Sequence, residues 1–363
     1  MKDRNMPAQG NKTGRAPLTY DLITKYRGAL MGLTILGIMF FHFTEDCRNY
    51  DVKFHGLIKY YYTFIGSSGV DVFLALSGFG LFYSMKRKPN APLRQFYWRR
   101  YTRILIPYLL VAVPSLLWRD VLVNHESILY FLKELSFVTL IQQGRTWYWY
   151  ILMIGLCYLI FPYLFQLIDR AADDLSAQTR IVTWASFVTI GCIVLQLYAG
   201  ELFKHTNIAL LRFPPFIIGC YLGRAAWQKK RICPGVLALC GFSVLVLQLR
   251  TYNAVILNRY TMAFFNLALC LLFVIALEYT PVGRAKQTVI KVLDWFGAYS
   301  LEIYLTHVMI RGVLNTLGYY TSRFRYEALM LVLSLLLSLL LKRITDALTG
   351  LLNRHISPKS EAQ

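Results

Sequence analysis

Long apolar segments recur along this chain, and they restrict its fold more than any other feature. Each is about 20 residues long, the length that an α-helix needs to cross a hydrocarbon layer roughly 30 Å thick. Of the 363 residues, 56% are hydrophobic and only 16% are charged, so a soluble fold could not hide the apolar side chains from water. The sequence therefore predicts an all-α, polytopic integral membrane protein.

The apolar runs, read between charged residues, Pro and Gly, predict about ten transmembrane helices. The expected spans are 28–44, 57–83, 104–123, 147–168, 181–199, 208–227, 232–249, 260–280, 292–317 and 328–349. The sixth span is the weakest, because it contains Arg212, Pro214 and Pro215. A broken or re-entrant helix is as consistent with that segment as a straight one.

The positive charges predict how the helices are oriented. When alternate connections are assigned to two sides of the membrane, one side holds 26 of the 39 Lys and Arg residues. Cytoplasmic loops carry such an excess of cations, so both termini are expected in the cytoplasm and the protein in the inner or plasma membrane. We divide the chain into a basic cytoplasmic tail (1–26), a ten-helix membrane domain (27–350) and a cytoplasmic C-terminal tail (351–363).

The formal net charge is +20, which taken alone could suggest a nucleic-acid partner. The cations, however, lie in short segments between apolar runs, where membrane lipid headgroups and an anionic ligand are the expected partners. We therefore expect no nucleic acid. The seven Cys residues include no Cys-x-x-Cys pair, so we predict neither a disulfide framework nor a metal site.

Few ionisable residues lie inside the spans, and each is a functional candidate because such a group is costly in hydrocarbon. On the first span, Arg27 is expected at the cytoplasmic edge and His42 toward the outer side, about 22 Å away at 1.5 Å per residue. An imidazole can take a proton from a hydroxyl near neutral pH. The alternatives are a positive-inside anchor for Arg27 and a histidine hydrogen-bonded to a neighbouring helix for His42.

The second span is rich in Gly and Ser and carries Asp71. The small residues predict close helix packing, whereas a carboxylate in a helix seam needs a partner. His42 or a cation of the ninth span could supply it, and the contact could orient the imidazole or be a plain structural ion pair. On the ninth span His307 could face the bundle interior and Glu302 a different seam, and a structural role is equally consistent with each.

The segment before the third span, 84–103, contains seven cations and no acid. Arg100 and Arg103 lie three residues apart at the start of a helix and therefore share one face. Two guanidiniums could grip a phosphate there, assisted by the partial positive charge of the helix N-terminus. An ordinary positive-inside anchor would also explain the cations. The first alternative predicts a phosphorylated ligand that binds from the cytoplasm.

Four blocks of the sequence resemble the membrane-bound acyltransferase-3 family, which includes O-acetyltransferases of bacterial cell-surface polysaccharides. The blocks are YRGALMGLTILGIMFFH, GSSGVDVFLALSGF, FYWRRYTRILIPYLL and GAYSLEIYLTH, which follow in the family's order over nearly the whole chain. The resemblance implies a ten-helix architecture and transfer of an acyl group, usually acetyl from cytoplasmic acetyl-CoA, to a hydroxyl of an extracytoplasmic glycan. It also implies that Arg27, His42, Arg100 and Arg103 correspond to the family's first-span Arg and His and to its Arg-x-x-Arg.

The sequence departs from the commoner family pattern at two places. Fourteen residues lie between Arg27 and His42, more than is usual, which changes the depth at which the arginine lies. The acidic residue that many members carry after a tryptophan of the fourth span is absent from TWYWYILMIG. We therefore expect the chain to belong to a subgroup with a different acceptor.

The residues and the resemblance together predict an O-acyltransferase whose substrates are acyl-CoA and a cell-surface or lipid-linked glycan. In this interpretation Arg100, Arg103 and Arg27 bind the CoA phosphates. His42 acts as general base for the acceptor hydroxyl or as transient acyl carrier.

Two further residues complete the predicted catalytic set, Asp71 to orient His42 and His307 as a second acid or base. The rival hypothesis is a transporter or flippase for a lipid-linked saccharide, in which the same buried charges line a path. The two hypotheses differ on CoA, because a flippase has no need to bind it.

Overall fold

The computed structural model describes residues 17–49, 53, 55–233, 235, 238, 255–319 and 323–356. In this part of the chain the regular elements are helices, and seven helical segments are long and apolar enough to cross a membrane. The prediction of an all-α, polytopic membrane protein is confirmed. The expected seventh span, 232–249, lies almost wholly outside the described residues.

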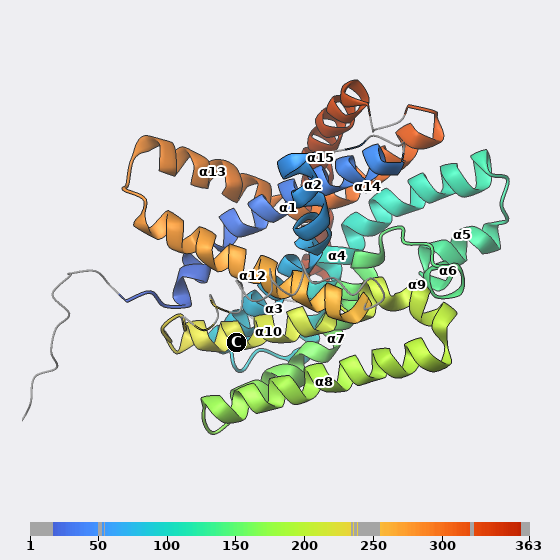
Figure 1. The fold of residues 1–363 in the computed structure, drawn as a ribbon. Coiled ribbons are helices and arrows are strands. Elements are labelled where there is room, and N and C mark those ends of the chain that lie inside the picture. The colour runs from blue at the N-terminus through green and yellow to red at the C-terminus, as the bar shows by residue number, and fades with distance from the viewer. Residues whose placement is uncertain are drawn as a thin grey trace, which may run out of the picture.

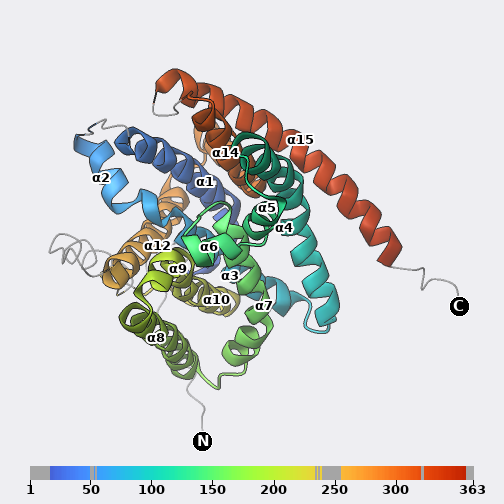
Figure 2. The ribbon, with the colours of Figure 1, turned by 90° about the vertical axis from the view of Figure 1, so that its right-hand side faces the viewer.

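The seven segments belong to one helical bundle, with α8 and α15 at opposite edges (Figures 1 and 2). They are α1 (Asp21–Asn49), α4 (Leu93–Leu116) continued by the π-helical η2 (Leu117–Val123), α7 (Trp149–Asp169), α8 (Asp174–Tyr198), α9 (Gly200–Leu210) with α10 (Phe213–Trp227), α12 (Val255–Tyr279) and α15 (Phe324–Ile356).

The predicted second span, 57–83, is not one helix. It is divided into α2 (Gly56–Phe64), the 3₁₀ turn η1 (Gly66–Ser68) and α3 (Gly69–Arg87). The run Gly-Ser-Ser-Gly explains the break, because Gly is flexible and Ser side chains compete for backbone hydrogen bonds. Asp71 consequently lies in the first turn of α3.

The ninth span, predicted over 292–317, is likewise divided. α13 (Arg284–Ala298) and α14 (Ser300–Thr316) meet at Tyr299, whose backbone has φ −103° and ψ 8°. α13 and the short helices α5 and α6 lie at opposite ends of the bundle (Figure 1). His307 therefore belongs to the separate helix α14.

The sixth span is broken, as its composition allows. α9 ends at Leu210 and α10 begins at Phe213, so Arg212 lies at the break. The connection before α7 holds two helices that the sequence did not indicate, α5 (Ile128–Leu135) and α6 (Val138–Gln143). Breaks of this kind place polar residues inside the bundle without requiring a continuous apolar span.

Small residues set the closest helix contacts. A Cβ added to Gly219 of α10 would collide with the backbone of α3 at Ala75. A Cβ on Gly32 of α1 would collide with the backbone of α13 at Leu293. These seams hold α3 and α1 at the centre of the molecule, where close approach of the backbones replaces side-chain interdigitation.

Candidate active site

Two cavities meet inside the bundle. The histidine cavity, as we call it, has a volume of about 650 Å³, and its lining includes His42 and Arg212. The basic cavity has a volume of about 520 Å³, and its lining includes Arg27, Arg100 and Arg103. Both volumes lie in the range of small-molecule binding sites.

The two cavities share part of their walls. Ile38 of α1, Val70 of α3 and Tyr304 of α14 line both cavities. Tyr304 is buried, and its ring packs edge-on against that of Tyr150 with the centroids 5.4 Å apart. At these three side chains a group bound in one cavity comes closest to the other cavity.

The three arginines singled out from the sequence meet at the basic cavity. Arg27 of α1 donates a hydrogen bond from Nε to the carbonyl of Leu76 at 3.2 Å, and Nη2 of Arg100 lies 3.5 Å from the hydroxyl of Ser84. Among the described residues, none of the three arginines forms a salt bridge. Several guanidiniums around one cavity are able to bind an anion.

Gly80 of α3 leaves the space that Arg27 occupies. A Cβ at this position would lie 2.8 Å from Nη2 of Arg27. On the other side, Gly28 of α1 faces the carboxyl group of Asp294 on α13, which is the acidic residue of the cavity lining. The close packing of three helices thus directs the Arg27 side chain into the basic cavity.

His42 and His307 form a hydrogen-bonded pair. Nδ1 of His42 lies 2.9 Å from Nε2 of His307, and the ring planes are inclined by 13°. His307 is 1% exposed, and its Nδ1 has no hydrogen-bond partner within the described residues. The side chain of His42 lines the histidine cavity. Because His307 engages its Nδ1, the Nε2 atom of His42 is the ring nitrogen that remains for another contact. His307 thus points into the bundle, and Glu302 faces Lys342 of α15 instead, 3.6 Å away.

One helical turn further on, α1 and α14 are joined again, by what we call the Arg311 clamp. Arg311 donates from Nε to Asp46 at 2.8 Å, and from Nη2 to Asp46 at 2.5 Å and to Glu45 at 2.8 Å. Asp46 follows His42 by four residues, and Arg311 follows His307 by four. Since residues four apart share a helix face, the clamp and the histidine pair fix the same two helix faces against each other.

Asp71 meets Arg212 rather than His42 or a cation of the ninth span, which corrects the predicted contact. Its carboxylate is fully buried and lies 3.3 Å from Nε of Arg212. The guanidinium of Arg212 in turn lies 4.6 Å from the centre of the Trp149 ring. Arg212 lies at the break between α9 and α10, so no helical periodicity predicts its contact with Asp71. The side chain that contacts His42 is instead that of His307.

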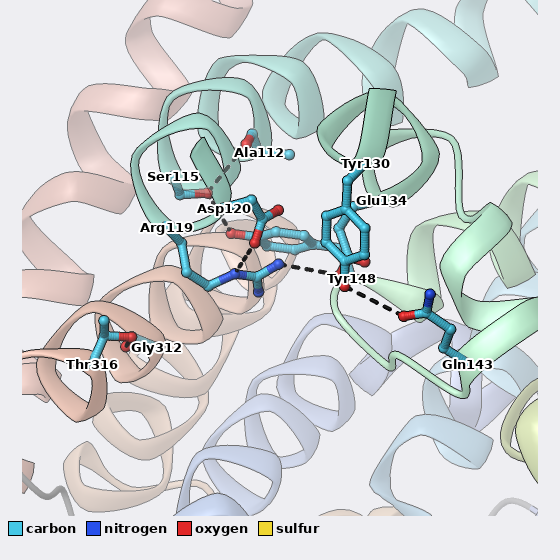
Figure 3. A network of polar contacts seen from close by, with 10 residues as sticks. All are labelled: Ala112, Ser115, Arg119, Asp120, Tyr130, Glu134, Gln143, Tyr148, Gly312 and Thr316. Carbon is cyan, nitrogen blue, oxygen red and sulfur yellow. Dashed lines mark hydrogen bonds and ion pairs between the residues drawn. The ribbon is translucent and has the colours of Figure 1, made fainter. Parts of the chain in front are cut away.

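A further polar network, shown in Figure 3, supports the wall of the histidine cavity. Nε of Arg119, on η2, donates to Asp120 at 2.6 Å, and Nη2 donates to Glu134 of α5 at 3.3 Å. The same guanidinium lies 4.3 Å from the centre of the Trp147 ring, and Trp147 lines the histidine cavity. This network was not predicted, although an Arg-Asp pair at the end of an apolar run signals buried charge.

Fold and site together define a polytopic membrane protein with a cationic cavity and a histidine-containing cavity that adjoin each other. The family model described as "Acyltransferase domain", Acyl_transf_3, matches residues 29–343. The chain therefore belongs to the acyltransferase-3 family and is a membrane acyltransferase. No curated protein and no solved structure matches it. The matched range begins just after Arg27 and includes the histidine pair, Arg100 and Arg103.

Proposed function

We propose that this chain transfers an acyl group, and specifically acetyl, from cytoplasmic acyl-CoA to a hydroxyl of an extracytoplasmic or lipid-linked polysaccharide. The observation that carries the proposal is the wall shared by the two cavities. Arg27, Arg100 and Arg103, which have no salt bridge within the described part of the chain, line one side of it, and His42, hydrogen-bonded to His307, lines the other. With donor and acceptor on opposite sides, only the acyl group needs to pass Ile38, Val70 and Tyr304.

The basic cavity suits the acyl-CoA donor. Its three arginines can bind the phosphates, since guanidiniums form charge-assisted hydrogen bonds with phosphate oxygens. Much of the remaining lining is apolar or carries hydroxyl groups, such as those of Tyr150 and Tyr158. This lining fits the uncharged pantetheine arm. The thioester would then lie near Tyr304, at the boundary with the histidine cavity.

His42 is the proposed general base. For its Nε2 to accept a proton, Nδ1 must carry the hydrogen and donate it to Nε2 of His307. The acceptor oxygen attacks the thioester carbonyl carbon while its proton passes to Nε2 of His42. A carbon–oxygen bond forms, the carbon–sulfur bond breaks, and the CoA thiolate takes the proton from His42. His307 positions the base.

The histidine cavity suits a saccharide acceptor. Its lining combines the ring of Trp147 with the hydrogen-bonding groups of Glu45, Asn315 and Thr316. Polar groups at fixed positions within a partly apolar wall are the usual means of orienting a small ligand. The excess of cations on the side of the basic cavity supports a cytoplasmic donor and a location in the inner or plasma membrane. The family match does not favour the transporter hypothesis.

Mass spectrometry of surface glycans tests the proposal. Cells with and without the gene are compared, and membranes that contain the protein are supplied with isotope-labelled acetyl-CoA. We expect an acetyl-sized mass difference between the glycans of the two strains and label in the same glycan fraction. If an expressed, correctly inserted protein produced neither, the proposal would fail. Label on His42 in the absence of acceptor would assign it the role of acyl carrier instead of base.

A further inference from the structure

A third cavity adjoins the basic cavity, and we call it the entrance groove. Its volume is about 610 Å³, and it lies between the end of α3, the first turns of α4 and the end of α7. Ser84, Arg100 and Arg103 line both the entrance groove and the basic cavity. A ligand that reaches into the basic cavity can therefore extend into the groove.

The entrance groove has an excess of positive charge. Lys88, Arg99 and Arg170 add to the two shared arginines. All three side chains are exposed, and within the described ranges none is in a salt bridge. The acidic residue of the lining, Asp169, is neutralised by Lys86 at 2.9 Å. The groove therefore offers more cations than its own carboxylate can balance, which favours a ligand with several negative charges.

Aromatic rings form part of the same lining. Phe96 and Phe165 both line the groove, and each is supported from behind. The ring of Phe96 stacks on Phe161 with the centroids 5.6 Å apart, and that of Phe165 packs on Phe82 at 5.0 Å. Rings held in this way can receive a flat heterocycle, and cations interleaved with aromatic faces are typical of sites for bases and phosphates.

We propose that the entrance groove binds the adenosine 3′-phosphate end of acyl-CoA. Arg99 and Arg170 contact the 3′-phosphate, Phe96 and Phe165 pack against the adenine, and the two shared arginines contact the pyrophosphate. The inference rests on the proposed function, because it assigns the remainder of the same donor. An anionic lipid headgroup carries similar phosphate chemistry, so the test must separate these two sources of phosphate.

The test compares CoA with dephospho-CoA, which differs only by the 3′-phosphate. Purified full-length protein in phosphatidylcholine nanodiscs is titrated with each by calorimetry. Charge-assisted hydrogen bonds to a phosphate predict that wild type binds CoA about ten- to hundredfold more tightly than dephospho-CoA. In the double variant Arg99→Ala, Arg170→Ala this ratio should fall to near one. Arg94→Ala is the matched control, because Arg94 is exposed on the same helix and lines none of the three cavities.

The outcomes separate the inference from the function on which it rests. If wild type binds both nucleotides but the double variant keeps the wild-type ratio, the groove assignment is wrong and the proposed function stands. If wild type binds neither nucleotide, the proposed function itself fails. The titrations are repeated in nanodiscs that contain phosphatidylglycerol. A different result would be that the double variant changes the ratio of the affinities for CoA and dephospho-CoA only in the nanodiscs that contain phosphatidylglycerol. This result would assign the groove to lipid and overturn the inference.

Discussion

The Arg311 clamp gives the most detailed prediction about the histidine pair. Its three hydrogen bonds join α1 to α14 one turn beyond the contact between His42 and His307. Replacing Arg311 with Gln removes the charge and the two-pronged geometry. The ends of the two helices beyond the histidine pair would then be free to separate, and the hydrogen bond between the imidazoles would be formed in a smaller fraction of molecules.

The exposure of the three side chains sets the size of this effect. Removing one partner of a buried ion pair costs about 3–5 kcal/mol. The side chain of Asp46 is 5% exposed, but that of Arg311 is 20% and that of Glu45 is 37% exposed, so solvent screens part of the interaction. We therefore expect a cost of about 2 kcal/mol, which corresponds to a decrease in kcat of up to about thirtyfold.

Steady-state kinetics of the purified protein in nanodiscs measures this effect. The Arg311→Gln variant should lower kcat and leave KM for acetyl-CoA unchanged, because Arg311 does not line the basic cavity. The matched control is Arg94→Gln, and the double variant Asp46→Arg, Arg311→Asp should recover part of kcat by restoring the pair in reverse. A folded Arg311→Gln protein with wild-type kcat, or with a change in KM alone, would show that the Arg311 clamp does not hold the histidine pair together.

Three other predictions concern the arginines, the buried ion pair and the helix seam. The double variant Arg100→Ala, Arg103→Ala should raise KM for acetyl-CoA at least about tenfold with little change in kcat, and an unchanged KM in the same kinetic assay would remove these residues from the donor site. Asp71→Ala takes the buried carboxylate away from Arg212 and should destabilise the protein by roughly 3–5 kcal/mol, so a wild-type Tm in detergent would argue against the ion pair. Gly32→Leu places a side chain against the backbone of α13 and should lower both Tm and CoA affinity, whereas a variant that retained both would show that the seam tolerates bulk.

Hydropathy alone predicted the membrane character and most of the long helices. It failed where polar and small residues interrupt a run. The break at Gly66–Ser68 was visible as Gly-Ser-Ser-Gly, but the apolar residues on either side outweighed it. The break at Tyr299 has no proline to mark it, and close packing of α13 against α1 beside it cannot be read from hydropathy.

The candidate site was predictable where it depends on neighbours in sequence. Arg100 and Arg103 share a helix face at a spacing of three, and both line the basic cavity as that spacing indicates. Contacts between distant helices were not predictable. His42 and His307 are 265 residues apart, and no periodicity relates them. Arg212 was visible as a charge in the weakest span, yet its pairing with Asp71 depends on how α10 packs against α3.

The catalytic role of His42 is the central claim, and one comparison tests it most directly. Transfer of labelled acetyl from acetyl-CoA to the acceptor glycan is measured for His42→Ala in proteoliposomes, with CoA affinity measured on the same sample. The control is His55→Ala, an exposed histidine whose side chain makes no capping hydrogen bond to α2. We predict that CoA affinity is retained in both variants, and that transfer falls by about 10²–10⁴-fold in His42→Ala alone. Transfer at the wild-type rate by a correctly inserted His42→Ala protein would contradict the account.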